Sequence, residues 1–140
     1  MRILLDTCVI SELRKADINP RLKELIDVID EKDLFISVIS LGELVKGISL
    51  LDEGQRKREL LSWIGGFERT FADRILHVDQ ETAHIWGEVT AKTQKAGKIV
   101  PACDGLIAAT ALKHGLHLLT RNSTDFAPTG VLIINPWLTH

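Results

Sequence analysis

The sequence predicts an α/β fold, in which a mostly parallel, twisted sheet of about five strands carries helices on both faces. Short runs of apolar and β-branched residues alternate along the chain with longer stretches of helical periodicity. Strands that alternate with helices favour parallel pairing, because each helix returns the chain to the start of the next strand. The 140 residues suit one domain, and no repeat or long linker divides them. We therefore expect a single domain over residues 1–140.

Five apolar runs are the expected strands. Each is rich in Ile, Leu, Val or Phe, as strands buried on both faces are, and polar or turn-forming residues follow it. The runs are residues 2–5, 34–38, 75–78, 116–120 and 131–134. Strands of this length are typical of a small parallel sheet.

Helical stretches fill the intervals between these runs. They are expected at residues 7–15, 20–29, 40–51, 53–71, 79–97 and 101–115. Pro20 and Pro101 suit the first turn of a helix, and Ser40 and Asp79 are residue types that cap an N-terminus. Apolar residues at 22, 25, 26 and 29 give the second helix one buried face. Gly115 suits the C-terminal end of the last helix.

Composition narrows the possible functions. The net charge is −2, so no overall basic field attracts nucleic acid, and a phosphate-bearing substrate would need a metal or a local basic patch. Cys8 and Cys103 are the two cysteines, and their spacing argues against a zinc site or a disulfide scaffold, so both are expected to pack as small apolar groups. We expect no signal peptide and no membrane span, and therefore a cytoplasmic protein.

Acidic and amide side chains follow three of the expected strands. Asp6 ends the first strand, and Glu43 lies in the first turn of the helix after the second. The helix carrying Asp104 runs almost directly into the fourth strand, so its start is expected at the carboxyl edge of the sheet. Asn122 and Asp125 follow the fourth strand. If these strands are parallel neighbours, all five side chains meet at the edge where open α/β sheets bind ligands.

Each position also has an ordinary structural explanation. Ser40 and Glu43 match a capping box, in which the glutamate accepts a hydrogen bond from the amide of the cap residue. Asp104 suits the positive end of a helix dipole, and Asp6 suits a turn. Taken one at a time, these explanations are favoured. Taken together, they do not account for so many oxygen-bearing side chains at one edge of the sheet.

Clustered carboxylates without nearby histidines or cysteines are hard oxygen ligands, which suit Mg²⁺ or Mn²⁺ rather than Zn²⁺. Such an ion would bridge the protein and a phosphate oxygen and carry the water that attacks phosphorus. The chain lacks the glycine-rich phosphate loop, the dinucleotide fingerprint, the HExxH zinc motif and the nucleophile elbow. The expected chemistry is therefore metal-dependent phosphodiester hydrolysis.

Four segments resemble the motifs of PIN-domain ribonucleases of the VapC toxin type, in the order found in that family. They are residues 3–12 (ILLDTCVISE), 40–47 (SLGELVKG), 102–115 (ACDGLIAATALKHG) and 119–126 (LTRNSTDF). The ending Asn135-Pro136-Trp137 is similar to the FitB branch of this family. The resemblance covers essentially the whole chain, and the segment around Asp104 is its most specific part.

The resemblance implies an endoribonuclease that depends on Mg²⁺ or Mn²⁺, with Asp6, Glu43 and Asp104 as catalytic metal ligands. Asn122 stands where a fourth acid is often found, which leaves open whether one or two metals bind and whether Asp125 compensates. The family usually has Asn or Ser at the position of Cys8.

Further roles are assigned to neighbouring side chains. Thr7 and Thr120 are candidates for orienting the acids, although their hydroxyls could equally bond to backbone. Arg121 is the favoured contact to a substrate phosphate, and Lys46 is a second candidate. The basic run at residues 56–58 is equally well explained as a solvated helix face.

The resemblance also implies partners: an RNA substrate, a cognate antitoxin, and a homodimer or a higher assembly with that antitoxin. Apolar helices over residues 41–71 are expected to line the antitoxin groove. Within them, Trp63, Phe67 and Phe71 recur every four residues, a spacing more typical of core than of a binding site.

Three other functions stay open from the sequence. The first is a non-catalytic antitoxin-binding module, for which the neutral Asn122 leaves room. The second is a phospho-receiver module, although the paired acids and the final lysine that such modules need are missing. The third is a phosphatase with Asp6 as nucleophile, where Cys8 occupies the position of the usual second Asp.

Overall fold

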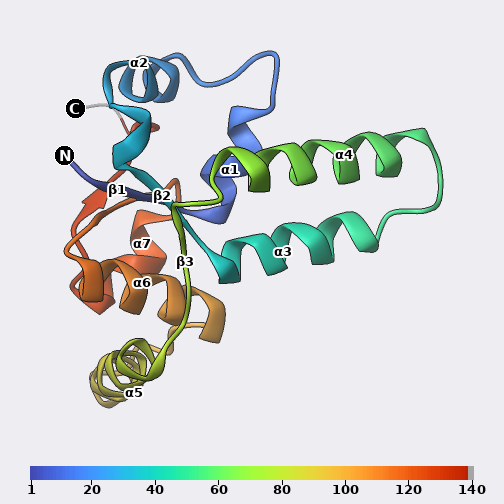
Figure 1. Ribbon diagram of the computed structural model, residues 1–140. Coiled ribbons are helices and arrows are strands. Elements are labelled where there is room, and N and C mark those ends of the chain that lie inside the picture. The colour runs from blue at the N-terminus through green and yellow to red at the C-terminus, as the bar shows by residue number, and fades with distance from the viewer. Residues whose placement is uncertain (139–140) are drawn as a thin grey trace.

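The computed structural model describes residues 1–138, so the last two residues of the expected domain lie outside the described part (Figure 1). Five strands form one sheet in which every pairing is parallel. They are β1 (Ile3–Leu5), β2 (Leu34–Ser37), β3 (Ile75–Leu76), β4 (His117–Leu119) and β5 (Ile133–Ile134). Each strand lies inside the apolar run expected for it, so the predicted parallel sheet is confirmed.

The strand order β3-β2-β1-β4-β5 places the N-terminal strand at the centre of the sheet. The chain first adds β2 and β3 on one side of β1, and then crosses over to add β4 and β5 on the other side. Leu5 pairs with Leu119, and the amide of Asp6 donates to the Leu119 carbonyl at 3.0 Å. The direction of winding thus changes between β1 and β4. The carboxyl ends of such a strand pair are where open α/β sheets bind ligands.

Seven α-helices and two short 3₁₀ helices connect these strands within the described residues. The α-helices are α1 (Thr7–Leu13), α2 (Pro20–Val28), α3 (Val38–Ser49), α4 (Gln55–Thr70), α5 (Gln80–Lys95), α6 (Ala102–His114) and α7 (Ser123–Phe126). The 3₁₀ helices are η1 (Glu31–Asp33) and η2 (Ala127–Thr129). The first six α-helices match the expected stretches, whereas α7 lies in a segment for which no helix was expected.

The start of α3 differs from the prediction. The helix begins at Val38, and the hydroxyl of Ser37 caps it by accepting from the Ile39 amide at 3.0 Å. Ser40 is therefore fully buried inside the first turn rather than at the cap. The capping-box explanation for Glu43 is wrong. Ser37 and Ser40 are both possible N-cap residues, and the structure uses Ser37.

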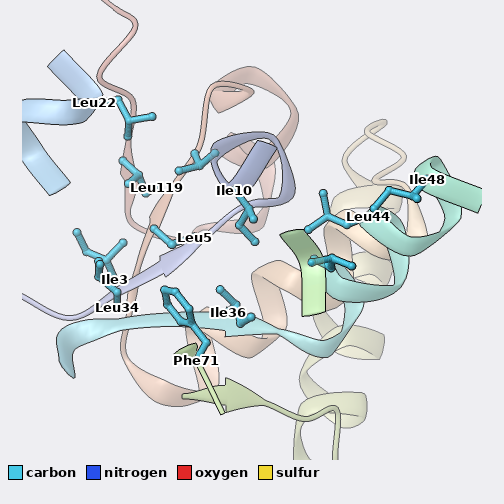
Figure 2. Close-up of a cluster of buried hydrophobic side chains, with 12 residues drawn as sticks. Ile3, Leu5, Ile10, Leu22, Leu34, Ile36, Leu44, Ile48, Phe71 and Leu119 are labelled. Atoms are coloured by element: carbon cyan, nitrogen blue, oxygen red, sulfur yellow. The ribbon is translucent and has the colours of Figure 1, made fainter. Parts of the chain in front are cut away.

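The sheet has an apolar core on each face, as its alternating side chains require. On one face Ile3, Leu5 and Leu119 pack with residues of α1, α2, α3 and α4 (Figure 2). On the other face Leu4 and Leu118 pack with residues of α6 and α7. The side chains of these five strand residues are fully inaccessible to solvent. The sheet is therefore held between two helical layers, which confirms the expected placement of helices on both faces.

Helices α3 and α4 form an antiparallel pair that projects away from the sheet (Figure 1). At the base of α4, the rings of Phe67 and Phe71 stack with centroids 4.5 Å apart, and Trp63 follows at 5.8 Å from Phe67. Phe71 is buried, and the other two rings are half-buried against the same core. The core interpretation of this aromatic stripe is confirmed for Phe67 and Phe71, whereas Trp63 packs against the core and also lines a groove described below.

The two cysteines have different surroundings, although both were expected to pack as small apolar groups. Cys103 is exposed, so that expectation is wrong for this residue. Cys8 is half-buried beside polar side chains described below. In residues 1–138 no helix combines the length and the apolar character that crossing a bilayer requires.

Candidate active site

Asp6 lies at the junction of β1 and α1 and is buried, with a relative exposure of 4%. Its Oδ1 accepts from the Thr7 amide at 2.8 Å, and its Oδ2 accepts from the Thr120 hydroxyl at 2.7 Å. The thiol of Cys8 also donates to Oδ2, at 3.4 Å. Donors from the ends of both central strands therefore fix the orientation of this carboxylate.

Glu43 reaches the same place from α3. The Thr7 hydroxyl donates to Oε1 of Glu43 at 2.7 Å and lies 2.9 Å from the Ser40 hydroxyl. Thr7 thus contacts Asp6 through its amide and Glu43 through its side chain. The two acids, which are far apart in the sequence, are linked by one threonine. The orienting roles predicted for Thr7 and Thr120 agree with these hydrogen bonds.

Asp104 stands in the first turn of α6 and is half-buried. Burial raises the pKa of its carboxyl from the ordinary 3.8 to about 6, and the negative charges of Asp6, Glu43 and Asp125 add to this effect. Like charges raise a carboxyl pKa in this way when they lie near it. The structure therefore brings four acids from β1, α3, α6 and α7 into one electrostatic environment.

The remaining candidates lie at the margin of this cluster. The backbone amide of Asn122 donates to the Thr120 hydroxyl at 2.9 Å, but its side chain is exposed and makes no capping bond to α7. Arg121 is exposed and its guanidinium lies 5.8 Å from the ring centroid of Trp137. Lys46 is exposed on α3. Within residues 1–138, neither basic side chain forms an ion pair with the acids.

Cys8 contributes a contact that sequence reasoning missed. Burial, together with the charge of Asp6, raises the pKa of its thiol to about 11. At neutral pH the residue is therefore a protonated thiol that donates to Asp6 rather than a reactive thiolate. The motif position usually filled by a polar residue retains a weak donor here. The sequence contained the signal, since Cys8 lies two positions after Asp6 at the start of a helix.

The donor set suits a hard divalent cation, because it consists of carboxylate oxygens and contains no histidine. A cation among these acids would also offset the mutual repulsion that raises the pKa of Asp104. In the described part of the chain, however, no three His, Cys, Asp or Glu side chains are grouped closely enough to enclose an ion. The acids thus share one environment without forming a closed set of ligands.

Replacing Asp104 with asparagine is expected to raise the free energy of unfolding at pH 7.5, in the presence of chelator, by about 1 kcal/mol. The folded chain holds the Asp104 proton more tightly than the unfolded chain, so this group lowers stability as pH rises from about 4 to about 6. The figure is reduced from the full shift because solvent screens a half-buried carboxyl. Urea unfolding at pH 7.5 and 3.5 checks this result: the difference between variant and wild type should vanish at pH 3.5.

Gly105 lies at a tight contact between α5 and α6. A Cβ atom at this position would lie 2.9 Å from Nε1 of Trp86 and 3.0 Å from Cγ2 of Thr90. The indole N–H of Trp86 is itself buried without a hydrogen-bond partner among the described residues. Because Gly105 directly follows Asp104, a shift of α6 at this contact would move the acid as well.

The Gly105→Ala variant is expected to lose about 1–3 kcal/mol of unfolding free energy through overpacking. Gly87→Ala in α5 is the matched control, because its Cβ would meet no atom within 4 Å, and alanine in an open helical position stabilises by up to ~1 kcal/mol. Thermal or urea unfolding distinguishes the two. Equal stability of both variants would show that α6 does not need the small residue, whereas Trp86→Phe should partly rescue Gly105→Ala.

A groove of about 300 Å³ opens on the Glu43 side of the acids, between α1, α3 and α4. Its apolar wall includes Leu44, Ile48 and Trp63, and Arg14 and Arg56 also line it. Glu43 and Thr7 form part of its lining, so the groove adjoins the acid cluster directly. It lies within the helices over residues 41–71 that were expected to form a partner groove.

Comparison with known proteins agrees with this geometry. The family model described as PIN domain matches residues 3–130. The toxin FitB of Neisseria gonorrhoeae is 37% identical over 136 residues, covering 96% of this chain and 98% of that protein. The VapC ribonuclease Y4jK of Sinorhizobium fredii is 35% identical over 136 residues, covering 96% and 97%. A solved structure of FitAB bound to an IR36 DNA fragment superposes with a TM-score of 0.91 at 34% identity, covering 99% of this chain and 97% of that one. The resemblance noted from the motifs is thereby confirmed: this chain belongs to the PIN-domain family, in the group of the FitB and VapC toxins.

Proposed function

We propose that this protein is a divalent-metal-dependent endoribonuclease and the toxin of a toxin–antitoxin pair. The observation that supports the proposal is the electrostatic effect of Asp6 and Glu43 on Asp104, near the point where the direction of winding changes, together with burial that raises the pKa of Asp104 to about 6. A relative named as a VapC ribonuclease, similar over nearly the whole chain, supports RNA as the substrate.

In this proposal Asp6, Glu43 and Asp104 hold Mg²⁺ or Mn²⁺. When bound, the ion supplies Lewis-acid activation of the phosphate and lowers the pKa of the attacking water. Asp6 is already oriented by the Thr7 amide and the Thr120 hydroxyl, and Thr7 orients Glu43. Asp104 has a pKa of about 6, so it is mainly ionised at neutral pH and available as a ligand.

The experiment is cleavage of single-stranded RNA by the purified protein. Cleavage is expected in Mg²⁺ or Mn²⁺, and is expected to stop with excess chelator and to resume when the ion is restored. At limiting Mg²⁺ or Mn²⁺ the rate should fall below about pH 6, because protons then compete with the ion for Asp104. Cleavage that continues undiminished in chelator would contradict the proposed chemistry.

We further propose that the cognate antitoxin occupies the groove between α1, α3 and α4. The FitAB structure contains a two-protein complex on DNA, and the groove here combines apolar walls with two arginines beside Glu43. A peptide lying there would cover the access to the acids. Co-expression with the antitoxin should suppress RNA cleavage, and Leu60→Glu in the wall of the groove should weaken this suppression. If the antitoxin suppresses cleavage by this variant as strongly as cleavage by the wild type, the antitoxin does not bind in this groove.

A second candidate is a toxin-like chain that binds its antitoxin without catalysis. Two observations favour it: no three potential ligands are grouped around one point in residues 1–138, and the exposed Asn122 supplies no charge. Calorimetric titration with Mn²⁺ separates the two candidates, because the non-catalytic chain would bind no ion.

The relatives are PIN-domain toxins and ribonucleases, which disfavours the phospho-receiver and phosphatase alternatives.

A further inference from the structure

Two depressions lie between the end of α5 and the α7–η2 segment, apart from the groove between α1, α3 and α4, and they share part of their walls. The inner cleft, about 260 Å³, lies between the connection of α5 to α6 (residues 97–101) and the region of α7, including Thr124 and Asp125. The outer cleft, about 470 Å³, lies between the end of α5 and η2. Lys98 and Pro128 line both, so the two clefts adjoin each other at these residues.

The inner cleft adjoins the candidate active site through two of its lining residues. Asp125, which lines it, is one of the charges that raise the pKa of Asp104. Pro101, which also lines it, is the N-cap residue of α6, and the first turn of that helix carries Asp104. The inner cleft is therefore the depression nearest in the fold to Asp104 on the side of Asp125 and Pro101.

Lysines gather along these two clefts, although the protein as a whole has a net charge of −2. Lys92 lines the outer cleft and Lys98 lines both, and Lys95 lies between them in sequence. All three are exposed, and none forms an ion pair within residues 1–138. Their charges are thus available to an anion.

A helix dipole explains only part of this cluster. Lys92 and Lys95 lie in the last turn of α5, where a positive charge is favoured by the helix itself. Lys98 lies beyond the helix. The left-handed Gly97, at φ +86°, reverses the chain, and the Lys98 amide then donates to the Thr93 carbonyl at 2.8 Å. This turn fixes the backbone of Lys98 between the two clefts.

The inner cleft combines surfaces that suit a single unstacked nucleotide. Val100, Pro101 and Pro128 offer apolar walls to the faces of a base, and Thr124 and Asp125 offer acceptors to amino groups on its edge. Single-stranded RNA is recognised in this way, by contact with splayed bases and by hydrogen bonds to their edges. Lysines beside such a pocket match the phosphates that precede and follow the base.

We propose that the inner and outer clefts hold the single-stranded RNA segment that flanks the scissile phosphate, with Lys98 and Lys92 contacting its backbone phosphates. This inference rests on the proposed nuclease function and adds the route of the substrate. The clefts assigned to RNA share no lining residue with the groove assigned to the antitoxin. In this proposal Lys92 and Lys98 make the basic contacts to the substrate, and the basic run at residues 56–58 does not.

The test is the salt dependence of RNA binding by the Lys92→Gln/Lys98→Gln double variant. The probe is a fluorescein-labelled, random-sequence, single-stranded 15-nucleotide RNA, and Asp6→Asn is present throughout to prevent cleavage. The slope of log K against log salt is expected to fall in magnitude by about 1.4, that is ~0.7 for each of two phosphate contacts to a single strand. In the otherwise wild-type chain, the same two changes should raise KM for RNA more than they lower kcat.

The matched control is Lys23→Gln/Lys32→Gln, which removes the same charge from α2 and η1, far from α5 (Figure 1). Its slope should equal that of the Asp6→Asn parent. If the Lys92/Lys98 variant has the same slope as this control, the clefts are not the route of the RNA. If the two lysines serve only the helix dipole, their replacement will lower the free energy of unfolding and leave the salt slope unchanged. That result would also overturn the proposal.

Failure of this inference is distinguishable from failure of the nuclease proposal. If the wild type cleaves RNA in a metal-dependent way but the Lys92/Lys98 variant keeps the parental slope and KM, only the route is wrong. If the wild type neither binds nor cleaves RNA, both are wrong. Thr124→Val separately tests whether a base binds in the inner cleft. It should alter the nucleotide preference beside the cleaved bond without altering the salt slope of binding. An unchanged preference would show that no base binds there.

Discussion

Asp104→Asn is expected to lower kcat/KM for RNA cleavage by on the order of 10²–10⁴-fold, because it removes one charged ligand and the several kcal/mol of transition-state stabilisation that a bound metal supplies. Asparagine keeps the size of the side chain and one oxygen. In the absence of metal, the same variant is expected to be more stable than the wild type, because it lacks a carboxylate charge that burial and the neighbouring acids disfavour. A loss of rate in a more stable protein is the signature of a functional acid rather than a structural one.

The control for this variant is Asp17→Asn, an exposed aspartate outside the described helices and strands. Its kcat/KM should match that of the wild type. Cleavage of a defined single-stranded RNA, followed under single-turnover conditions at saturating Mn²⁺, measures both. An Asp104→Asn rate within a factor of two of the control would exclude Asp104 from catalysis.

Thr120→Val is expected to weaken Mn²⁺ binding by about 10–100-fold, because Thr120 holds the carboxylate of Asp6 in place. The Thr120 hydroxyl is fully buried, donates to Oδ2 of Asp6 at 2.7 Å and accepts from the Asn122 amide at 2.9 Å. Loss of this hydroxyl leaves the buried Oδ2 of Asp6 and the partly buried amide of Asn122 short of a partner, which costs about 1–3 kcal/mol of unfolding free energy. The weak thiol donor of Cys8 remains, but it cannot replace the hydroxyl.

Thr110→Val is the matched control for Thr120→Val. Thr110 is equally buried, but its hydroxyl donates to the Leu106 carbonyl of its own helix, at 2.8 Å. Isothermal titration with Mn²⁺ and urea unfolding measure the two effects. Equal Mn²⁺ affinities in the two variants would show that the hydroxyl of Thr120 does not orient a metal ligand.

The parallel sheet and the first six α-helices could be predicted because their signals are local. Apolar runs, Pro20 at a helix start and Asp79 at a cap act within a few residues. Asp79 accepts from the Thr82 amide at 2.9 Å, as its position in the sequence suggested. Local signals failed where two residues of one type competed, as at Ser37 and Ser40. They also failed for α7, whose polar residues are typical of loops.

The grouping of the acids could be predicted in outline because parallel strands place their carboxyl ends at one edge. The contacts that orient Asp6 could not, since Thr120 lies 114 positions away and both hydroxyl and backbone bonding were equally plausible for it. The lysine clefts were also beyond the sequence. They form where residues 97–101 meet residues 124–128, and no spacing along the chain indicates that contact.

The central claim is that Asp6, Glu43 and Asp104 together bind a divalent cation, and a crystal soaked in Mn²⁺ tests it most directly. An anomalous density peak between the carboxylates of these three residues is the predicted result, with Thr7 and Thr120 still bonded to Glu43 and Asp6. Full soaking at millimolar Mn²⁺ that leaves no peak among these acids, or places the ion elsewhere on the protein, would contradict the account.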